Sequence, residues 1–240
     1  MTSTRAKFAG VAKCCTLGPS IEIGAVMTTL FIAGATGLVG GRALALALAD
    51  PRITRVIAPT RRAIPAQDRL VNPRLDDLLA NAGHADWHAD AAICALGTTR
   101  AAAGSAAAFR AVDHDLVLLL ARRLREAGVT RFALVSALGA NPRSPLLYPR
   151  TKGEVEQAVG ALGFPSVTIL QPGFLDGERA ENRPMERLVG RVLRVAAPLL
   201  PRVARVSPVA TVAQRLVEAA VAGQPGTDLI GAADLSERGG

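Results

Sequence analysis

Aromatic residues and lysine are scarce in this sequence, and the first scarcity excludes a class of partner. Aromatic residues make up 3% of the 240 residues, so the chain offers no stacking platform of the kind that binds single-stranded nucleic acid. The formal net charge of +8 comes from arginines dispersed along the whole chain, without a basic block. We therefore expect solvated surface arginines and no nucleic-acid partner.

Cysteine and histidine are also rare, which argues against a metal site. Cys14, Cys15 and Cys94 show no metal-ligand spacing, and an adjacent pair is a poor disulfide. The histidines are too scattered for a convincing ligand set, although His84 and His88 lie four residues apart. We predict no metal, and a reducing compartment that we take to be the cytoplasm.

Long apolar runs are missing, although half of the chain is hydrophobic. No run reaches the roughly eighteen residues that span a bilayer, and the richest, LVLLLA and VAAPLLP, are short or broken by proline. We expect a soluble protein without a membrane span, with one sizeable core and one α/β domain. For the basic stretch RLVGRVLRVAAPLLPRVARV two interpretations stay open: a cover over a substrate pocket, which we favour, or an amphipathic helix on an anionic membrane.

The first 26 residues differ in composition from the rest. They contain three basic residues and one acidic residue, and no uninterrupted apolar stretch of the kind that secretory signals have. Met27 stands immediately before a strand-like run. We predict a disordered extension at 1–26 and a single domain at 27–240.

From Thr29 onward short β-like runs alternate with helical stretches, which is typical of a parallel sheet. Six strands are expected, at 30–34, 55–60, 69–72, 91–96, 131–137 and 166–173. Helices are expected at 38–50, 105–128 and 149–162, and further helices between about 173 and 240 would cover the substrate. The pattern predicts an α/β fold with a doubly wound parallel sheet.

Three glycines, Gly34, Gly37 and Gly40, lie between the first strand and the first helix. In a dinucleotide-binding turn the first glycine permits the tight turn, the second lets a pyrophosphate approach the backbone, and the third lets helix and strand pack closely. The phosphates would lie at the helix N-terminus, where free N–H groups and the helix dipole favour anions. Because the triplet follows a strand and opens a helix, it predicts a Rossmann fold that binds a dinucleotide.

Two arginines follow the second strand, where cofactor preference is decided. An acidic residue there holds the ribose 2′-hydroxyl of NAD, whereas arginine accommodates the 2′-phosphate of NADP. Arg61 and Arg62 occupy this region, and no acidic residue lies between Asp50 and Asp68. We predict NADP(H) as the cofactor, the alternative being two ordinary surface arginines.

The only tyrosine, Tyr148, precedes by four residues the only lysine beyond residue 13, Lys152. Residues four apart share one face of a helix, and Pro149 is tolerated in a first turn. A nearby ammonium favours the ionised form of a phenol, so a lysine here would activate the tyrosine. Ser136 ends a strand twelve residues earlier, where parallel sheets carry ligand-binding groups.

Ser136, Tyr148 and Lys152 together resemble the catalytic set of short-chain dehydrogenases/reductases, and the resemblance extends from about Thr28 to the final helix. More narrowly, ALGTTR, FRAVDHD, LLYPRTKGEVE and QPGFLDGERAENRP resemble the atypical branch represented by the Tat-interacting-protein oxidoreductases. The resemblance implies an NADP(H)-dependent oxidoreductase acting on a small-molecule carbonyl or alcohol, with Tyr148 as general acid/base. A non-catalytic NADPH sensor that acts through a protein partner is the alternative function.

The resemblance also implies cofactor contacts beyond the glycines and arginines. Thr36, Gly37, Leu38 and Val39 would contact the pyrophosphate, and Leu96 and Gly97 would line the adenine-ribose side. Lys152 would contact the nicotinamide ribose, and Leu175 and Arg179 would close over the nicotinamide end. For Leu96, Gly97 and Leu175, ordinary loop and core packing is an equal alternative. Asp113 stands where many short-chain enzymes have an asparagine in a proton relay, which leaves that relay in doubt.

The composition break generates one prediction. A chain that begins at Met27 is expected to fold and to bind dinucleotide as the full chain does, because the composition changes there and Met27 stands immediately before the first strand-like run. Thermal unfolding and dinucleotide titration of both chains check this. A large drop in melting temperature on truncation would show that the extension packs on the domain.

Overall fold

Seven parallel strands form a single sheet in the order β3-β2-β1-β4-β5-β6-β7. The computed structural model describes residues 27–81, 87–176 and 206–236. The strands are β1 (Thr28–Ala33), β2 (Ile53–Ile57), β3 (Leu70–Val71), β4 (Ala91–Cys94), β5 (Arg131–Val135), β6 (Ser166–Leu170) and β7 (Gly226–Ile230). The predicted doubly wound parallel sheet is confirmed.

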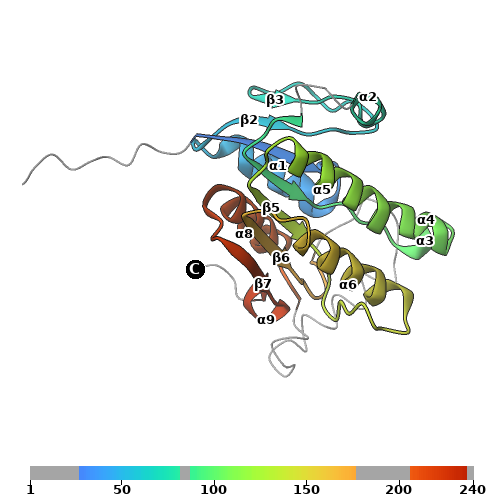
Figure 1. Cartoon of the computed structure of the whole chain (residues 1–240). Helices are drawn as coiled ribbons and strands as arrows, with labels where there is room; N and C mark the ends of the chain where they lie inside the picture. Colours follow the sequence, from blue (N-terminus) through green and yellow to red (C-terminus); the bar gives the residue numbers. More distant parts are fainter. Residues whose placement is uncertain (1–26, 82–86, 177–205, 237–240) are drawn as a thin grey trace, which may run out of the picture.

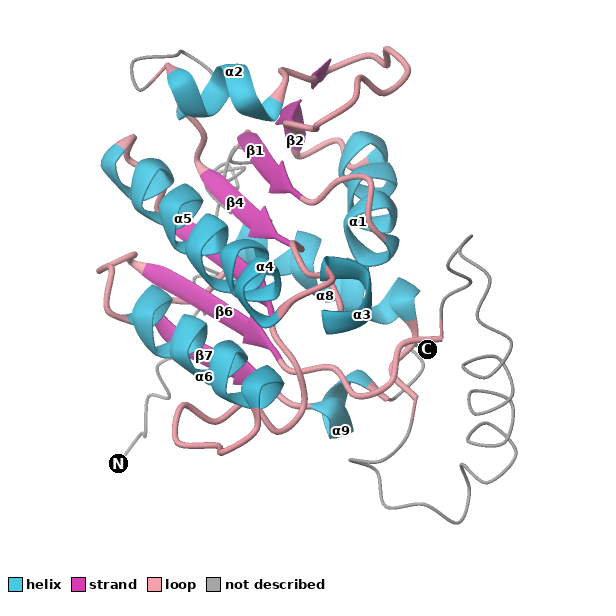
Figure 2. Cartoon of the chain, turned by 90° about the vertical axis from the view of Figure 1, so that its right-hand side faces the viewer, coloured by secondary structure: helices cyan, strands magenta, loops and turns pink. Residues whose placement is uncertain are grey.

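Helices cover both faces of this sheet (Figures 1 and 2). α1 (Leu38–Ala49) and α8 (Val209–Ala222) pack on one face, and α5 (Val117–Glu126) and α6 (Leu147–Gly160) pack on the other. The shorter helices are α2 (Leu75–Ala80), α3 (Arg100–Ala103), α4 (Ala106–Arg110) and α9 (Ala232–Leu235). None of the helices in these described ranges combines the length and apolar character that a bilayer crossing needs.

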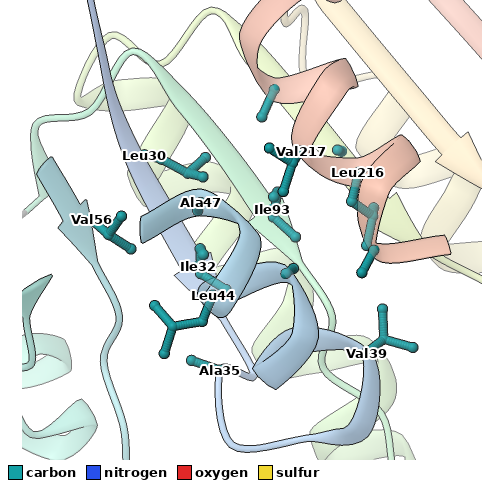
Figure 3. Packing of buried hydrophobic residues seen from close by; sticks show 14 of the residues in the cluster. Leu30, Ile32, Ala35, Val39, Leu44, Ala47, Val56, Ile93, Leu216 and Val217 are labelled. Atoms are coloured by element: carbon teal, nitrogen blue, oxygen red, sulfur yellow. The ribbon is translucent and has the colours of Figure 1, made fainter. Parts of the chain in front are cut away.

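The core consists of two apolar layers, one on each side of the sheet. Figure 3 shows the first layer, in which Leu30 and Ile32 of β1 meet Leu44 and Ala47 of α1 and Leu216 of α8. All four residues of β4 and all five of β6 are buried. Central parallel strands are covered on both faces and so carry apolar side chains at successive positions, which is why the sequence identified them.

Two expectations about the elements were wrong. The helix expected over 105–128 is divided into α4, a π-helical segment η2 (Ala111–Leu116) and α5, with Asp113 buried in the π turn. The sequence predicted six strands, and β7 is the seventh. β7 lies at the sheet edge and is mostly exposed, so it lacks the apolar pattern that marks a buried strand.

The chain on either side of 177–205 is held together at the end of β6. Leu175 pairs with Ser207 in an isolated parallel bridge, and the Ser207 N–H donates to the Phe174 carbonyl at 2.7 Å. Asp176 Oδ1 accepts from the Val209 N–H, the first residue of α8, at 2.7 Å. The predicted extension at 1–26 and the middle of the predicted covering region lie outside the described residues.

Candidate functional site

The carboxyl ends of the strands bring the predicted site residues to one edge of the sheet. Gly34 follows β1, Arg61 follows β2, Gly97 follows β4 and Ser136 follows β5. β1 and β4 are neighbours in the sheet, and the helices that follow them, α1 and α5, lie on opposite faces. This is the topological switch point at which open α/β sheets bind their ligands.

Two glycines make the β1–α1 turn possible. A Cβ added at Gly34 would lie 2.7 Å from the Ala95 carbonyl oxygen, and Gly34 adopts a left-handed φ of +86°. A Cβ added at Gly40 would lie 2.1 Å from the Gly34 carbonyl oxygen. These distances are shorter than any real Cβ contact, so both positions require glycine on packing grounds.

The first turn of α1 itself contributes no side chain that would compete with an anion. Gly37 is the N-cap and offers no side chain, and the first turn contains no acidic residue. Thr36 is exposed beside it, and Leu38 is half-buried. Val39 packs in the core, so any contact that it makes with a pyrophosphate would be through its backbone.

Arg61 and Arg62 are exposed in a loop that buried polar groups shape. The Thr60 hydroxyl, in a side chain that is 5% exposed, donates to the Arg62 carbonyl at 2.7 Å. The Asn72 amide donates to Thr60 Oγ1 at 2.8 Å and to the Ala58 carbonyl at 2.6 Å. Neither arginine forms an ion pair with another described residue, so both guanidinium groups are available to a ligand at the end of β2.

Three of the four residues expected at the two ends of the cofactor lie in the described part of the chain. Leu96 is half-buried against the core layer that contains α5 and α6, and Leu175 packs against the layer that contains α1 and α8. Gly97 lies over the α6 lysine: a Cβ added there would be 3.7 Å from Lys152 Nζ. Arg179 lies outside the described residues.

The catalytic candidates lie immediately after β5 and on α6. α6 begins at Leu147, so Tyr148 and Pro149 are in its first turn and Lys152 follows one turn later. The Tyr148 side chain is 45% exposed, and its ring centroid lies 5.8 Å from that of Phe109. Ser136 is 5% exposed, and its hydroxyl has no hydrogen-bond partner among the described residues.

Lys152 is buried and paired with a carboxylate. Its Nζ lies 2.7 Å from Oδ1 of Asp113, and the two side chains are 7% and 0% exposed. Oδ1 forms an ion pair there without a well-directed hydrogen bond. Oδ2 of Asp113 accepts from the Thr98 N–H at 2.7 Å, so one carboxylate touches both α6 and the loop after β4.

Cys94, at the end of β4, lies close enough to Lys152 and Asp113 for both charges to affect the pKa of its thiol. Burial raises the pKa of its thiol to about 11, the backbone N–H of Leu96 and the Lys152 ammonium oppose that rise, and Asp113 adds to it. At neutral pH the group is therefore a thiol, which is a poor nucleophile.

The sequence left two features of the site unidentified. The FRAVDHD stretch drew attention to Asp113, but nothing local indicated that its carboxylate pairs with Lys152, 39 positions away. The role of Asn72 in shaping the Arg61 loop had no sequence signal, because a single asparagine after a strand is common in turns.

Sequence comparison finds relatives that cover most of this chain, although no family model matches it. Protein fmp52, mitochondrial, of Emericella nidulans is 37% identical over 169 residues, which are 67% of this chain and 72% of that protein. Protein FMP52, mitochondrial, of Saccharomyces cerevisiae is 39% identical over 160 residues, which are 63% of this chain and 68% of that protein.

Solved structures share the fold at much lower identity. MoeE5 in complex with UDP-glucose and NAD has a TM-score of 0.64 at 19% identity, over 85% of this chain and 76% of that one. A short chain dehydrogenase family protein from Francisella tularensis has a TM-score of 0.61 at 12% identity, over 88% of this chain and all (100%) of that one. These likenesses confirm the Rossmann fold.

The names of the sequence relatives show that the predicted cytoplasmic location is wrong. The relatives in Emericella nidulans and Saccharomyces cerevisiae are both named mitochondrial. The prediction rested on cysteine usage, which reports a reducing environment and does not distinguish one reducing compartment from another.

The glycine turn generates a stability prediction with a matched control. Gly40→Ala is expected to lower the free energy of unfolding by about 1–3 kcal/mol, because the new methyl group meets backbone that has no room to move. Gly160→Ala, at the end of α6, is the control, since nothing described lies within 4 Å of an added Cβ there. Urea unfolding of both variants measures the difference, and equal midpoints would contradict the close approach at Gly40.

Proposed function

This chain belongs to the FMP52 family, and from that premise we propose that it is an NADP(H)-dependent oxidoreductase that interconverts a carbonyl and an alcohol. The observation that carries the proposal is the contact between the two halves of the site. A Cβ added at Gly97, at the switch-point edge, would lie 3.5 Å from Asp113 Oδ1 and 3.7 Å from Lys152 Nζ of α6, so a dinucleotide at this edge would reach the Tyr148 helix. The names of the relatives further support a mitochondrial location.

The residues at the switch point fit a dinucleotide. The turn at Gly34 and Gly40 has no space for side chains, and the α1 N-terminus carries neither a side-chain cap nor an acid. Backbone N–H groups and the helix dipole would hold the pyrophosphate there. MoeE5 is similar in fold and was solved with NAD, which supports a nicotinamide dinucleotide at this edge.

Preference for the 2′-phosphate would come from the end of β2. Arg61 and Arg62 are exposed there, and Thr60 and Asn72 hold their loop. A planar guanidinium offers paired N–H donors that match phosphate oxygens. Because no acidic residue lies between Asp50 and Asp68, nothing in this segment would repel the phosphate.

The nicotinamide supplies or accepts hydride when it is bound, and the protein supplies position and a proton. Ser136 has a buried hydroxyl without a described partner, and such a group gains most when a substrate oxygen bonds to it. Tyr148 would donate its phenolic proton to that oxygen in the reductive direction. Lys152 would favour the phenolate that remains, and it would also bind the nicotinamide ribose.

Cofactor preference provides the first test. Arg61→Ala is expected to weaken NADPH binding about ten- to a hundred-fold, since a charge-assisted contact contributes about 1.5–3 kcal/mol, and to leave NADH binding nearly unchanged. Calorimetric titration with both dinucleotides measures this. Arg122→Ala is the control, because Arg122 is an exposed arginine of α5 far along the chain from the β2 loop. Equal wild-type affinities for NADPH and NADH would contradict the NADP(H) assignment.

Proton transfer provides the second test. Tyr148→Phe keeps the ring beside Phe109 but removes the transferable proton. Turnover of any aldehyde or ketone that supports NADPH oxidation is expected to fall about 10²–10⁴-fold, the usual contribution of a positioned acid/base. NADPH affinity should be retained.

The Phe variant also separates catalysis from sensing. A sensor would show no turnover in the wild type across a panel of carbonyl substrates. If the Phe variant turns over as fast as the wild type, Tyr148 is a packing residue and the proton donor has been misassigned.

A further inference from the structure

Asp113 occupies a position that is costly for a carboxylate. Its side chain is fully buried, in a π-helical segment between α4 and α5. Taking a carboxylate out of water costs several kcal/mol unless charge and hydrogen bonds compensate it. A π turn inside a helix is itself uncommon, and such turns occur often at functional sites.

Both oxygens of Asp113 have specific partners, and these partners belong to different parts of the site. Oδ1 lies 2.7 Å from Lys152 Nζ, and Oδ2 accepts from the Thr98 N–H at 2.7 Å. One carboxylate therefore links η2 to the catalytic helix and to the loop after β4. An asparagine here could still accept from Thr98, but it would carry no charge to offset the ammonium.

We propose that Asp113 is a positioning residue that fixes the Lys152 ammonium beneath Gly97 and reduces the positive charge that Tyr148 experiences. The proposal rests on the proposed function, since it concerns the lysine that would tune the proton donor. In this arrangement Asp113 offsets most, but not all, of the Lys152 charge. A phenolate at Tyr148 is attracted by one member of the pair and repelled by the other.

The other charged side chains of α6 have partners of their own. Arg150 donates to the carbonyls of Ser144 and Pro145. Glu154 pairs with Arg110 of α4, and both oxygens of Glu156 accept from the Gln171 amide. β6, which also packs against α6, contributes no ionisable side chain, and Cys94 remains a thiol. The ionisable residues of α5 are Arg122, Arg123, Arg125 and Glu126. Arg123 lies 4.0 Å from Glu126, and Arg125 donates to the Gly163 carbonyl.

The presence of a single tyrosine makes the proposal measurable without substrate or cofactor. Tyr148 is the only phenol in the chain, so the ultraviolet absorbance of phenolate that develops with rising pH reports this residue alone. The indole of the one tryptophan does not ionise in this range and adds a constant background. Failure of turnover or of NADPH binding would leave this experiment intact, so the two proposals can fail separately.

Asp113→Asn is expected to move the midpoint of the phenolate titration to lower pH by about one unit, because the phenolate then faces an ammonium without its counter-charge. Asp115→Asn is the matched control: it removes the same charge from the same π segment, but its side chain is 63% exposed and pairs with His114. The control midpoint should equal that of the wild type. A midpoint in Asp113→Asn that is unchanged or raised would overturn the proposal.

A second variant covers the case in which Asp113→Asn fails to fold. Combining Asp113→Asn with Lys152→Met removes both charges and leaves no buried ion unpaired, a change that is often tolerated. Its midpoint is expected only slightly above that of the wild type, because Asp113 offsets most of the charge that Lys152 contributes. A midpoint well above the wild type would show that Lys152 acts uncompensated and that Asp113 has no moderating role.

Turnover gives an independent readout once a substrate is known. The pH dependence of kcat should shift to lower pH in Asp113→Asn, in parallel with the phenolate midpoint. A purely structural role would lower kcat at every pH by the same factor, and that result would also overturn the proposal.

Discussion

The close approach of β1, α1 and the loop after β4 is the constraint on which the rest of the site depends. Gly40 leaves no room for a side chain against the Gly34 carbonyl, and Gly34 leaves none against Ala95. The first contact sets where α1 begins, and the second fixes the path of the chain after β4. That path carries Gly97 over Lys152. The glycine turn after β1 is thus connected to α6 through the loop after β4 and the side chains of Asp113 and Lys152.

Most of the fold was predictable because central strands and covering helices are decided by burial. β4 is apolar throughout and β6 is buried at every position. α1 is rich in alanine and leucine, and Pro51 follows its end. The edge strand β7 was missed because exposure removes the apolar pattern. The π segment was missed because a change of hydrogen-bond register within a helix hardly alters the spacing of apolar residues. Periodicity reports which face is buried, and it says little about local backbone register.

In the candidate site, too, local sequence patterns were predictable and tertiary contacts were not. The glycine turn, the arginines after β2 and the Tyr148–Lys152 spacing are local patterns, and the structure places each at the carboxyl edge of the sheet. The pairing of Asp113 with Lys152 is a tertiary contact between two helical segments, so no short stretch of sequence contains it. The compartment could not be read from cysteine usage, because reducing conditions are common to more than one compartment. The sequence identifies such side chains but does not identify the distant residues with which they pair.

The bridge between Leu175 and Ser207 has a consequence for how this fold can diversify. The chain leaves the sheet at the end of β6 and returns to α8 through one pinned point, where Asp176 also binds the first N–H of α8. Whatever is inserted between these anchors begins and ends at the same place. Doubling the length of such a closed excursion costs only about 0.6 kcal/mol in chain entropy. A change of length between these two anchors would therefore leave the end of β6 and the start of α8 in place.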